Sequence, residues 1–139
     1  MPEVQRLEGG SIKHDVAVPV SRVAEFISAA LIAVERDLPG IRPVPFGHLC
    51  DGNIHFNLSQ PLEMSESKFM ALWPYFDRIV HDIVGQLDGT FAAEHGIGLL
   101  KRDDMRRYKS EIELDLMRCL KRSIDPFDLM NPGKIIPSD

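Results

Sequence analysis

The sequence predicts an α+β fold of the ferredoxin-like type, an antiparallel sheet with helices on one face. The predicted elements follow the order strand, helix, strand, strand, helix, strand, helix along 139 residues. A hairpin joins the second and third strands, because Asp51-Gly52 stands between two runs that alternate apolar and polar residues. Three further segments repeat apolar residues at helical spacing. This order leaves the second face of the sheet free for a functional site.

The first half of the chain supplies a strand, a helix and the hairpin. Lys13–Val20 alternates as a strand, and if its valines face the core, Lys13 lies on the opposite face. Ser21 is a suitable N-cap for a helix that ends at Pro39-Gly40. The hairpin strands are expected near 41–49 and 53–59.

The second half of the chain supplies two more helices and a short strand. Apolar spacing predicts a helix over Ser65–Leu87, with Pro74 kinking or restarting it. Thr90–Ala93 can form the last strand. Ser110 and Glu113 form a capping box that begins the third helix, and its apolar residues share one face.

Composition limits the classes of protein and partner. The chain is 44% hydrophobic and 27% charged, which suits one soluble globular domain over 1–139. A net charge of −5 gives no support for nucleic-acid binding. No apolar run approaches the roughly 20 residues that span a bilayer. Two cysteines form no disulfide or metal-finger pattern, so a reducing, cytoplasmic location is expected.

Residues 2–10 resemble a helix end, which indicates a fragment of a longer protein.

Two histidines of the hairpin form the first candidate site. If Asp51-Gly52 is a two-residue loop, His48 lies directly opposite His55, with Cβ atoms about 4.5–5.5 Å apart. Both histidines then face away from the predicted core residues Leu49, Ile54, Phe56 and Leu58. Packing does not explain such a pair, so the hairpin predicts two imidazoles that share a metal ion.

A second candidate segment contains Glu94 and His95. Alone, Glu94-His95-Gly96 is explained equally well by a strand end and a turn. Together with His48 and His55, however, Glu94 completes a set of ligands suited to Zn²⁺ or a similar ion with an open coordination position. Such an ion acts as a Lewis acid.

Other polar residues complete the predicted site. His95 is the candidate general base, because imidazole titrates near neutral pH. Lys13 and Asn57 are suited to binding a substrate carboxylate or hydroxyl. Asp51 is explained most simply as a turn residue and Cys50 by packing at the loop edge.

Four stretches resemble the C-terminal part of FAD-linked oxidases of the vanillyl-alcohol oxidase superfamily, especially the D-2-hydroxyglutarate and D-lactate dehydrogenase branch. They occur in the order found in that family and are Lys13–Pro19, Gly47–Asn57, Glu94–Gly98 and Asp125–Ile135. One departure is Cys50, where the family pattern has glycine.

The resemblance implies a flavin-dependent dehydrogenase that oxidises D-2-hydroxy acids. It implies a divalent metal held by His48, His55 and Glu94, with His95 removing the hydroxyl proton while hydride passes from C2 to FAD. The nitrogen and oxygen donors favour zinc. It also implies substrate contacts from Lys13 and Asn57. The implied cofactor contact is Asn131, in an Asn131-Pro132-Gly133 tail that folds back toward a flavin domain.

The FAD-binding domain that precedes this region in the family is absent from this chain, as is a substrate-binding arginine. We therefore expect a substrate- and metal-binding portion that is inactive without an FAD-binding domain or subunit. Its exposed sheet face could also drive homo-oligomerisation.

Two other functions remain open at this point. A self-contained metal-dependent hydrolase or lyase would use His95 as base and turn over without flavin. A non-catalytic metal-binding interaction module would retain partner binding after His95→Ala. The resemblance favours the oxidoreductase over both.

Overall fold

The computed structural model describes residues 9–137, which form two compact units divided between His95 and Gly96. The predicted helix end at 2–10 lies, apart from its last two residues, outside the described part. None of the described helices is long and apolar enough to cross a membrane.

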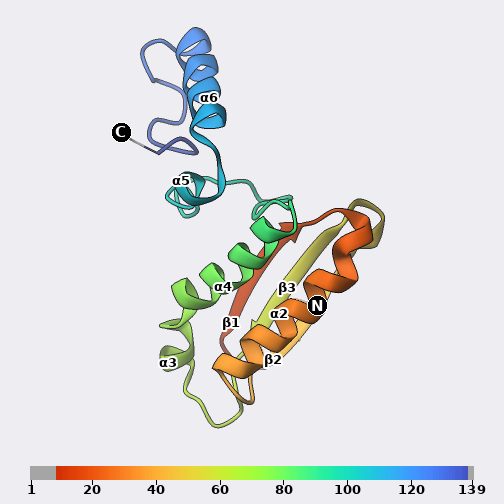
Figure 1. Cartoon of the computed structure of the whole chain (residues 1–139). Helices are drawn as coiled ribbons and strands as arrows, with labels where there is room; N and C mark the ends of the chain where they lie inside the picture. The colour runs from red at the N-terminus through yellow and green to blue at the C-terminus, as the bar shows by residue number, and fades with distance from the viewer. Residues whose placement is uncertain (1–8, 138–139) are drawn as a thin grey trace. The chain divides into compact units, whose positions relative to one another are not determined.

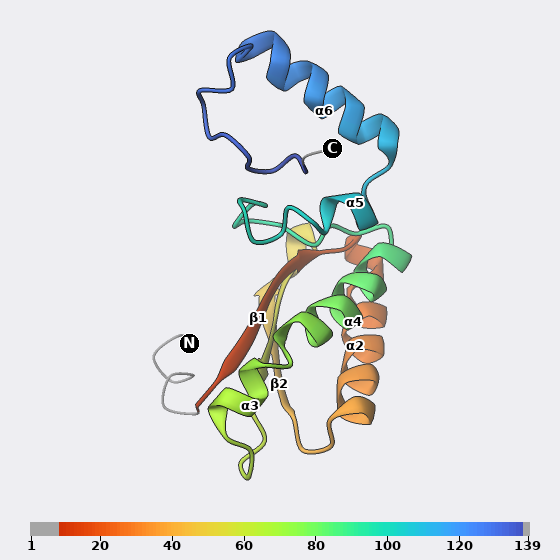
Figure 2. The same ribbon diagram turned by 90° about the vertical axis from the view of Figure 1, so that its left-hand side faces the viewer.

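The first unit is a three-stranded antiparallel sheet covered by helices on one face. The strands β1 (Ser11–Ala17), β2 (Arg42–His48) and β3 (Asn53–Ser59) lie in the order β1-β3-β2. Helices α2 (Val23–Asp37) and α4 (Trp73–Gln86) lie on the same side of the sheet in both views (Figures 1 and 2). This confirms the α+β class and the one-sided arrangement of helices.

The core of the first unit lies between the sheet and these helices. Alternate residues of β3 enter it, and Phe56 and Leu58 are fully buried. Phe26 of α2 packs edge-on against Phe56, with ring centroids 5.7 Å apart. Phe76 of α4 is also buried. The opposite faces of β1 and β3 therefore remain available for polar chemistry.

The hairpin loop is longer than predicted, which changes its register. Leu49–Asp51 forms a 3-10 turn, and only Gly52 takes a left-handed conformation, with φ +74°. A two-residue type I′ loop requires positive φ at both central residues, and Asp51 does not adopt it. His48 therefore pairs with Asn53, and His55 pairs with Phe46. The predicted direct pairing of the two histidines is wrong.

This two-residue shift preserves the faces of the strands, because side chains alternate with period two. His48 and His55 still point away from the core, while Ile54 and Phe56 are buried in it. Leu49 leaves the predicted core face and is 63% exposed in the turn.

The predicted fourth strand, Thr90–Ala93, is reduced to one antiparallel bridge between Thr90 and Ala17. This bridge lies beside β1, where a fourth ferredoxin-like strand would pair. Regular pairing does not continue, because the Ala92 amide turns to Thr90 Oγ1 and only the Ala93 amide returns to β1, at the Asp15 carbonyl oxygen. The N–H groups of Glu94 and His95 both donate to the Asp15 carboxylate.

The predicted N-cap Ser21 is wrong, because Ser21 lies in the 3-10 turn Val20–Arg22 and Arg22 is the N-cap residue of α2, without a side-chain capping bond. The boundaries of the later helices agree better with the prediction. The Ser65–Leu87 segment divides into α3 (Glu66–Met70) and α4, with Pro74 in the first turn of α4. In the second unit, α5 (Met105–Tyr108) precedes α6 (Glu111–Ile124). The predicted capping box at Ser110 is confirmed, because Glu113 and Ser110 bond each other's backbone amides reciprocally.

Candidate active site

The candidate site lies on the face of the sheet that the helices leave uncovered. Asp15 of β1 lies directly opposite His55 of the central strand β3. On the other side of His55 lies Phe46 of β2, whose ring centroid is 5.1 Å from that of the imidazole. Lys13 lies on the same face as Asp15, as the alternation of β1 predicted.

The segment after the Thr90 bridge brings Glu94 and His95 to this face. The amides of both residues donate to Asp15 Oδ2, each at 2.8 Å. The Ala93 amide also donates to the Asp15 carbonyl oxygen at 3.2 Å. Residues nearly 80 positions apart in the sequence are thereby joined at one point of the sheet.

Glu94 contacts both histidines of the hairpin. Its Oε1 lies 3.3 Å from His48 Nδ1, and its Oε2 lies 3.8 Å from His55 Nε2. Asn53 adds a hydrogen bond, donating from Nδ2 to Glu94 Oε1 at 2.9 Å. The three predicted metal ligands therefore lie together, although the two histidines do not pair directly.

The donor atoms present fit a divalent cation. Within the described residues, potential ligand atoms of Asp15, His55 and Glu94 all lie within 4.8 Å of one another. Asp15 Oδ1 is buried and makes no hydrogen bond to any described residue. Imidazole with carboxylate oxygens suits Zn²⁺ and Mn²⁺. His48 is not part of this group, but its Nδ1 lies near Glu94 Oε1, and its side chain is 63% exposed.

His95 lies beside this group with its Nδ1 3.1 Å from Asp15 Oδ2. Its side chain is 69% exposed, so a substrate can reach it. The His55 and His95 rings have centroids 6.0 Å apart. A candidate base therefore stands next to the candidate ligands, as the adjacency of Glu94 and His95 predicted.

Asp15 is the ionised centre of this arrangement. Burial raises the pKa of its carboxyl, but the backbone amides of His95 and Glu94 and the positive charges of protonated His95 and His55 outweigh it. The pKa therefore lies below its ordinary value of 3.8. The carboxylate is charged at neutral pH although the residue is only 4% exposed.

Lys13 and Asn57 form the next cross-strand pair along β1 and β3. They are two residues from Asp15 and His55 respectively, about 7 Å along each strand. Lys13 is exposed and Asn57 is buried. Both lie on the face of the candidate site, where their predicted substrate contacts can form.

Asn131 belongs to the second unit. It has a φ of 51°, and its side-chain oxygen accepts a hydrogen bond from Lys134 Nζ at 3.2 Å. Its role toward a cofactor stays a prediction.

Reasoning from sequence proposed no role for Asp15 or Asn53. Alternation placed both on the polar face, but neither has a distinguishing motif. Their functions in the site depend on contacts with Glu94, which is about 40 residues beyond Asn53 in the sequence.

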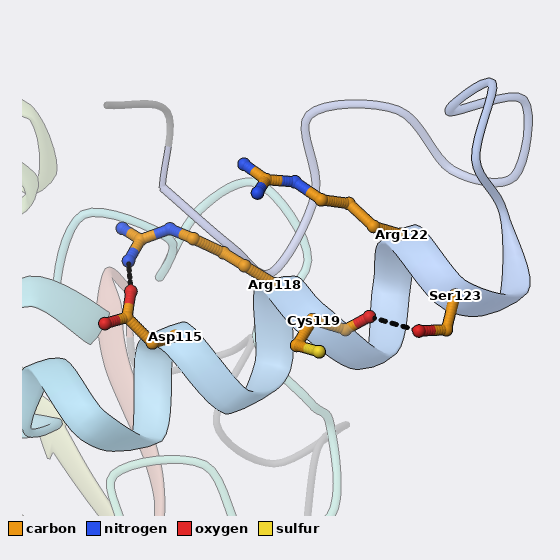
Figure 3. Close-up of a pocket in the computed structure, with 5 residues that line it drawn as sticks. All are labelled: Asp115, Arg118, Cys119, Arg122 and Ser123. Carbon is orange, nitrogen blue, oxygen red and sulfur yellow. Dashed lines mark hydrogen bonds and ion pairs between the residues drawn. The ribbon is translucent and has the colours of Figure 1, made fainter.

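The second unit has a surface hollow of about 580 Å³ along α6 (Figure 3). It is lined by side chains of this one helix, Asp115, Arg118, Cys119, Arg122 and Ser123. Arg118 donates to Asp115 at 2.9 Å, so part of its charge is already neutralised. None of the predicted site residues lines this hollow.

Comparison with known proteins identifies the family. A family model described as FAD linked oxidases, C-terminal domain, matches residues 1–135. The D-2-hydroxyglutarate dehydrogenase of Stutzerimonas stutzeri is 35% identical over 123 residues, covering 88% of this chain and 26% of that protein. The mitochondrial D-2-hydroxyglutarate dehydrogenase of Danio rerio is 31% identical over 134 residues, covering 95% of this chain and 24% of that protein. The D-2-hydroxyglutarate–pyruvate transhydrogenase of Saccharomyces cerevisiae is 30% identical, covering 92% of this chain and 26% of that protein.

The chain spans about a quarter of the length of these curated relatives. The match nevertheless extends over nearly all of the chain, including both of its compact units. The chain belongs to the family of FAD linked oxidases, as their C-terminal domain.

Proposed function

We propose that this chain is the substrate- and metal-binding part of a flavin-dependent dehydrogenase that oxidises D-2-hydroxy acids. One observation carries the proposal: Glu94 lies between His48 and His55, while His95 stands beside them on the same sheet face. The family supplies the flavin, and the names of the similar proteins supply the substrate class.

His48, His55 and Glu94 would hold a divalent metal ion, for which we favour zinc. The mixed nitrogen and oxygen donors suit that ion, and the buried Asp15 Oδ1 adds negative charge nearby. Such an ion would polarise the substrate hydroxyl as a Lewis acid. The chain's own contribution is to fix two of these donors on the sheet and to hold Glu94 beside them through Asp15 and Asn53.

Lys13 and Asn57 would bind the carboxylate of the substrate and orient C2. His95 would accept the hydroxyl proton at Nε2, because its Nδ1 faces the Asp15 carboxylate. FAD, when bound, supplies the acceptor for the hydride that leaves C2. The products are then a 2-oxo acid, a proton on His95 and reduced flavin.

The flavin would be held mainly by an FAD-binding domain or subunit that this chain does not include. Asn131 of the second unit is the residue of this chain that we propose to approach the flavin. Two observations support a separate flavin-binding part. The chain belongs to the C-terminal domain family of FAD linked oxidases, and it spans only about a quarter of the length of its relatives.

Metal content tests the ligand set directly. We expect about one equivalent of zinc or manganese in the purified chain by elemental mass spectrometry, and its loss in His48→Ala and His55→Ala. Cys119→Ser serves as the control, because this exposed free thiol is another potential ligand but lies on α6. Normal metal retention in His55→Ala, with folding verified by circular dichroism, would contradict the proposed site.

Dye reduction tests the need for a flavin domain. The metal-loaded chain alone should not reduce an artificial electron acceptor with D-2-hydroxy acids. Adding the FAD-binding domain should restore the reaction, and His95→Gln should abolish it. Turnover by the isolated chain without flavin would overturn this part of the proposal.

A further inference from the structure

Asp15 occupies the point where the strand, the hairpin and the Glu94-His95 segment meet. It is 4% exposed and lies on β1 opposite His55. Neither the sequence motifs nor the proposed ligand set gives this carboxylate a function. Its two oxygen atoms nevertheless face different parts of the site: Oδ2 lies near His95, and Oδ1 lies on the side of His55.

Asp15 Oδ2 holds the segment that carries the candidate base. It accepts the backbone N–H groups of Glu94 and His95 at 2.8 Å and lies 3.1 Å from His95 Nδ1. An ionised carboxylate can only accept hydrogen bonds. The neutral His95 ring is therefore favoured with its proton on Nδ1, which leaves the Nε2 lone pair free to accept a proton.

Asp15 Oδ1 faces the other histidine. It lies 3.9 Å from His55 Nδ1, while the Nε2 of the same ring lies 3.8 Å from Glu94 Oε2. Each nitrogen of His55 therefore faces a different carboxylate. In metal sites, a carboxylate beyond a histidine ligand commonly accepts the proton of the nitrogen that does not bind metal. Asp15 has this position relative to His55.

We propose that Asp15 is the positioning residue of the site and orients His55 and His95 so that the Nδ1 of each ring faces the Asp15 carboxylate. The Nε2 of His55 then faces the proposed metal position, and the Nε2 of His95 faces the substrate. The metal part of this inference rests on the proposed function. The orientation of the His95 ring does not, because its Nδ1 already lies 3.1 Å from Asp15 Oδ2 in the metal-free chain. Asp15 acts through these residues and need not touch the metal or the substrate itself.

The state of the two rings can be measured without metal or activity. Nitrogen-15 NMR of the metal-free chain at pH about 9, above the ordinary titration of imidazole, reports which ring nitrogen carries the proton. We expect the Nδ1–H form to predominate for His95, whose Nδ1 lies 3.1 Å from Asp15 Oδ2. A predominant Nε2–H form of His95 in the unmodified chain would overturn the proposal without any variant.

Asp15→Asn tests the carboxylate itself. Asparagine has a similar shape but cannot accept hydrogen bonds on both side-chain atoms, so the His95 ring should shift toward the Nε2–H form. Zinc affinity should fall about 10–100-fold, as is usual when a carboxylate behind a histidine ligand is removed. Unchanged ring resonances in Asp15→Asn would overturn the proposal whatever the metal content.

Asp125→Asn is the matched control. Asp125 is also buried and accepts two consecutive backbone amides, those of Leu129 and Met130 at 2.9 and 2.8 Å, but in the second unit. This variant should leave the histidine resonances and zinc affinity unchanged. Equal effects of the two variants would mean general destabilisation and would contradict the proposal. Absence of metal from the unmodified chain would contradict the proposed metal site alone, because the ring measurement remains decisive for Asp15.

Discussion

At the scale of single residues, Gly52 determines how the hairpin ends. Its φ of +74° is unfavourable for residues with a side chain, and a Cβ atom there would lie 2.0 Å from the Val18 carbonyl oxygen. The Gly52 carbonyl also accepts a hydrogen bond from the Val18 amide at 3.1 Å. Close approach of two backbones therefore requires glycine here and fixes the turn against the end of β1.

Gly52→Ala should consequently destabilise the chain strongly. We expect the unfolding free energy to fall by about 2–5 kcal/mol, from left-handed strain together with the clash. Gly96→Ala is the control, because Gly96 has nearly the same φ of +72°, but apart from its chain neighbours no atom of the described residues lies within 4 Å of an added Cβ. Its cost should be only about 1–2 kcal/mol in urea denaturation. Equal costs would show that the contact with Val18 does not matter.

The same turn shows where residue-level prediction succeeds. Strand alternation placed His48 and His55 on the correct face, because any even shift of register preserves it. It could not supply the register, which depends on whether Asp51 adopts positive φ. Asp15 illustrates a second limit. Its face was predictable from β1, but its partners arrive from Glu94 and His95, distant in the sequence.

At the scale of elements, α6 shows how local sequence alone can fix a helix terminus. Ser110 Oγ accepts the Glu113 amide at 3.3 Å, and the Glu113 carboxylate accepts the Ser110 amide at 2.9 Å. The Ser110 amide contributes most to lowering the pKa of Glu113 from 4.5 to about 2, with Lys109 and the Ser110 hydroxyl adding to it. The cap therefore depends on an ionised Glu113.

The capping box should weaken in acid. A carboxyl whose pKa is lowered by folding stabilises the helix above its unfolded pKa, and this contribution is lost as pH falls from about 4.5 to about 2. Carbon-13 NMR should show Glu113 titrating near 2, and nearer its ordinary value in Ser110→Ala. That variant should also cost about 1 kcal/mol of stability. Ser123→Ala, at the other end of α6, is the control, and titration of Glu113 at 4.5 in the unmodified chain would contradict the prediction.

Elements that depend on distant partners were harder to predict. The capping box and the division of Ser65–Leu87 at Pro74 follow from neighbouring residues and were predicted correctly. Thr90–Ala93 has the composition of a strand, but it forms a single bridge at Thr90, because the Ala92 amide turns to Thr90 Oγ1. The apolar face of α6 also differs from the prediction. Its regularly spaced residues Ile112, Leu116 and Leu120 are exposed, whereas Leu114 is buried.

At the scale of the whole molecule, the described chain has two compact units with separate buried residues. The main apolar cluster includes Phe56 and is built from the sheet, α2 and α4. Met105 of α5 and Leu114 of α6 are buried outside this cluster. Chain length and composition predicted one domain, because they do not show which buried positions contact one another.

We therefore expect core substitutions in the two units to act locally. Phe56→Ala should cost about 3–5 kcal/mol and Leu114→Ala about 2–5 kcal/mol, because each removes a fully buried side chain. In native-state hydrogen exchange, Phe56→Ala should reduce protection mainly in β1, β2 and β3, and Leu114→Ala mainly in α6. The exposed Leu116→Ala is the control for helix propensity and should change α6 little. Equal loss of protection in both units from either substitution would show that the chain unfolds as one cooperative body. In that case, a core substitution in either unit would destabilise the candidate site. If the units unfold separately, only core substitutions in the unit that contains Asp15, His55 and Glu94 should destabilise it.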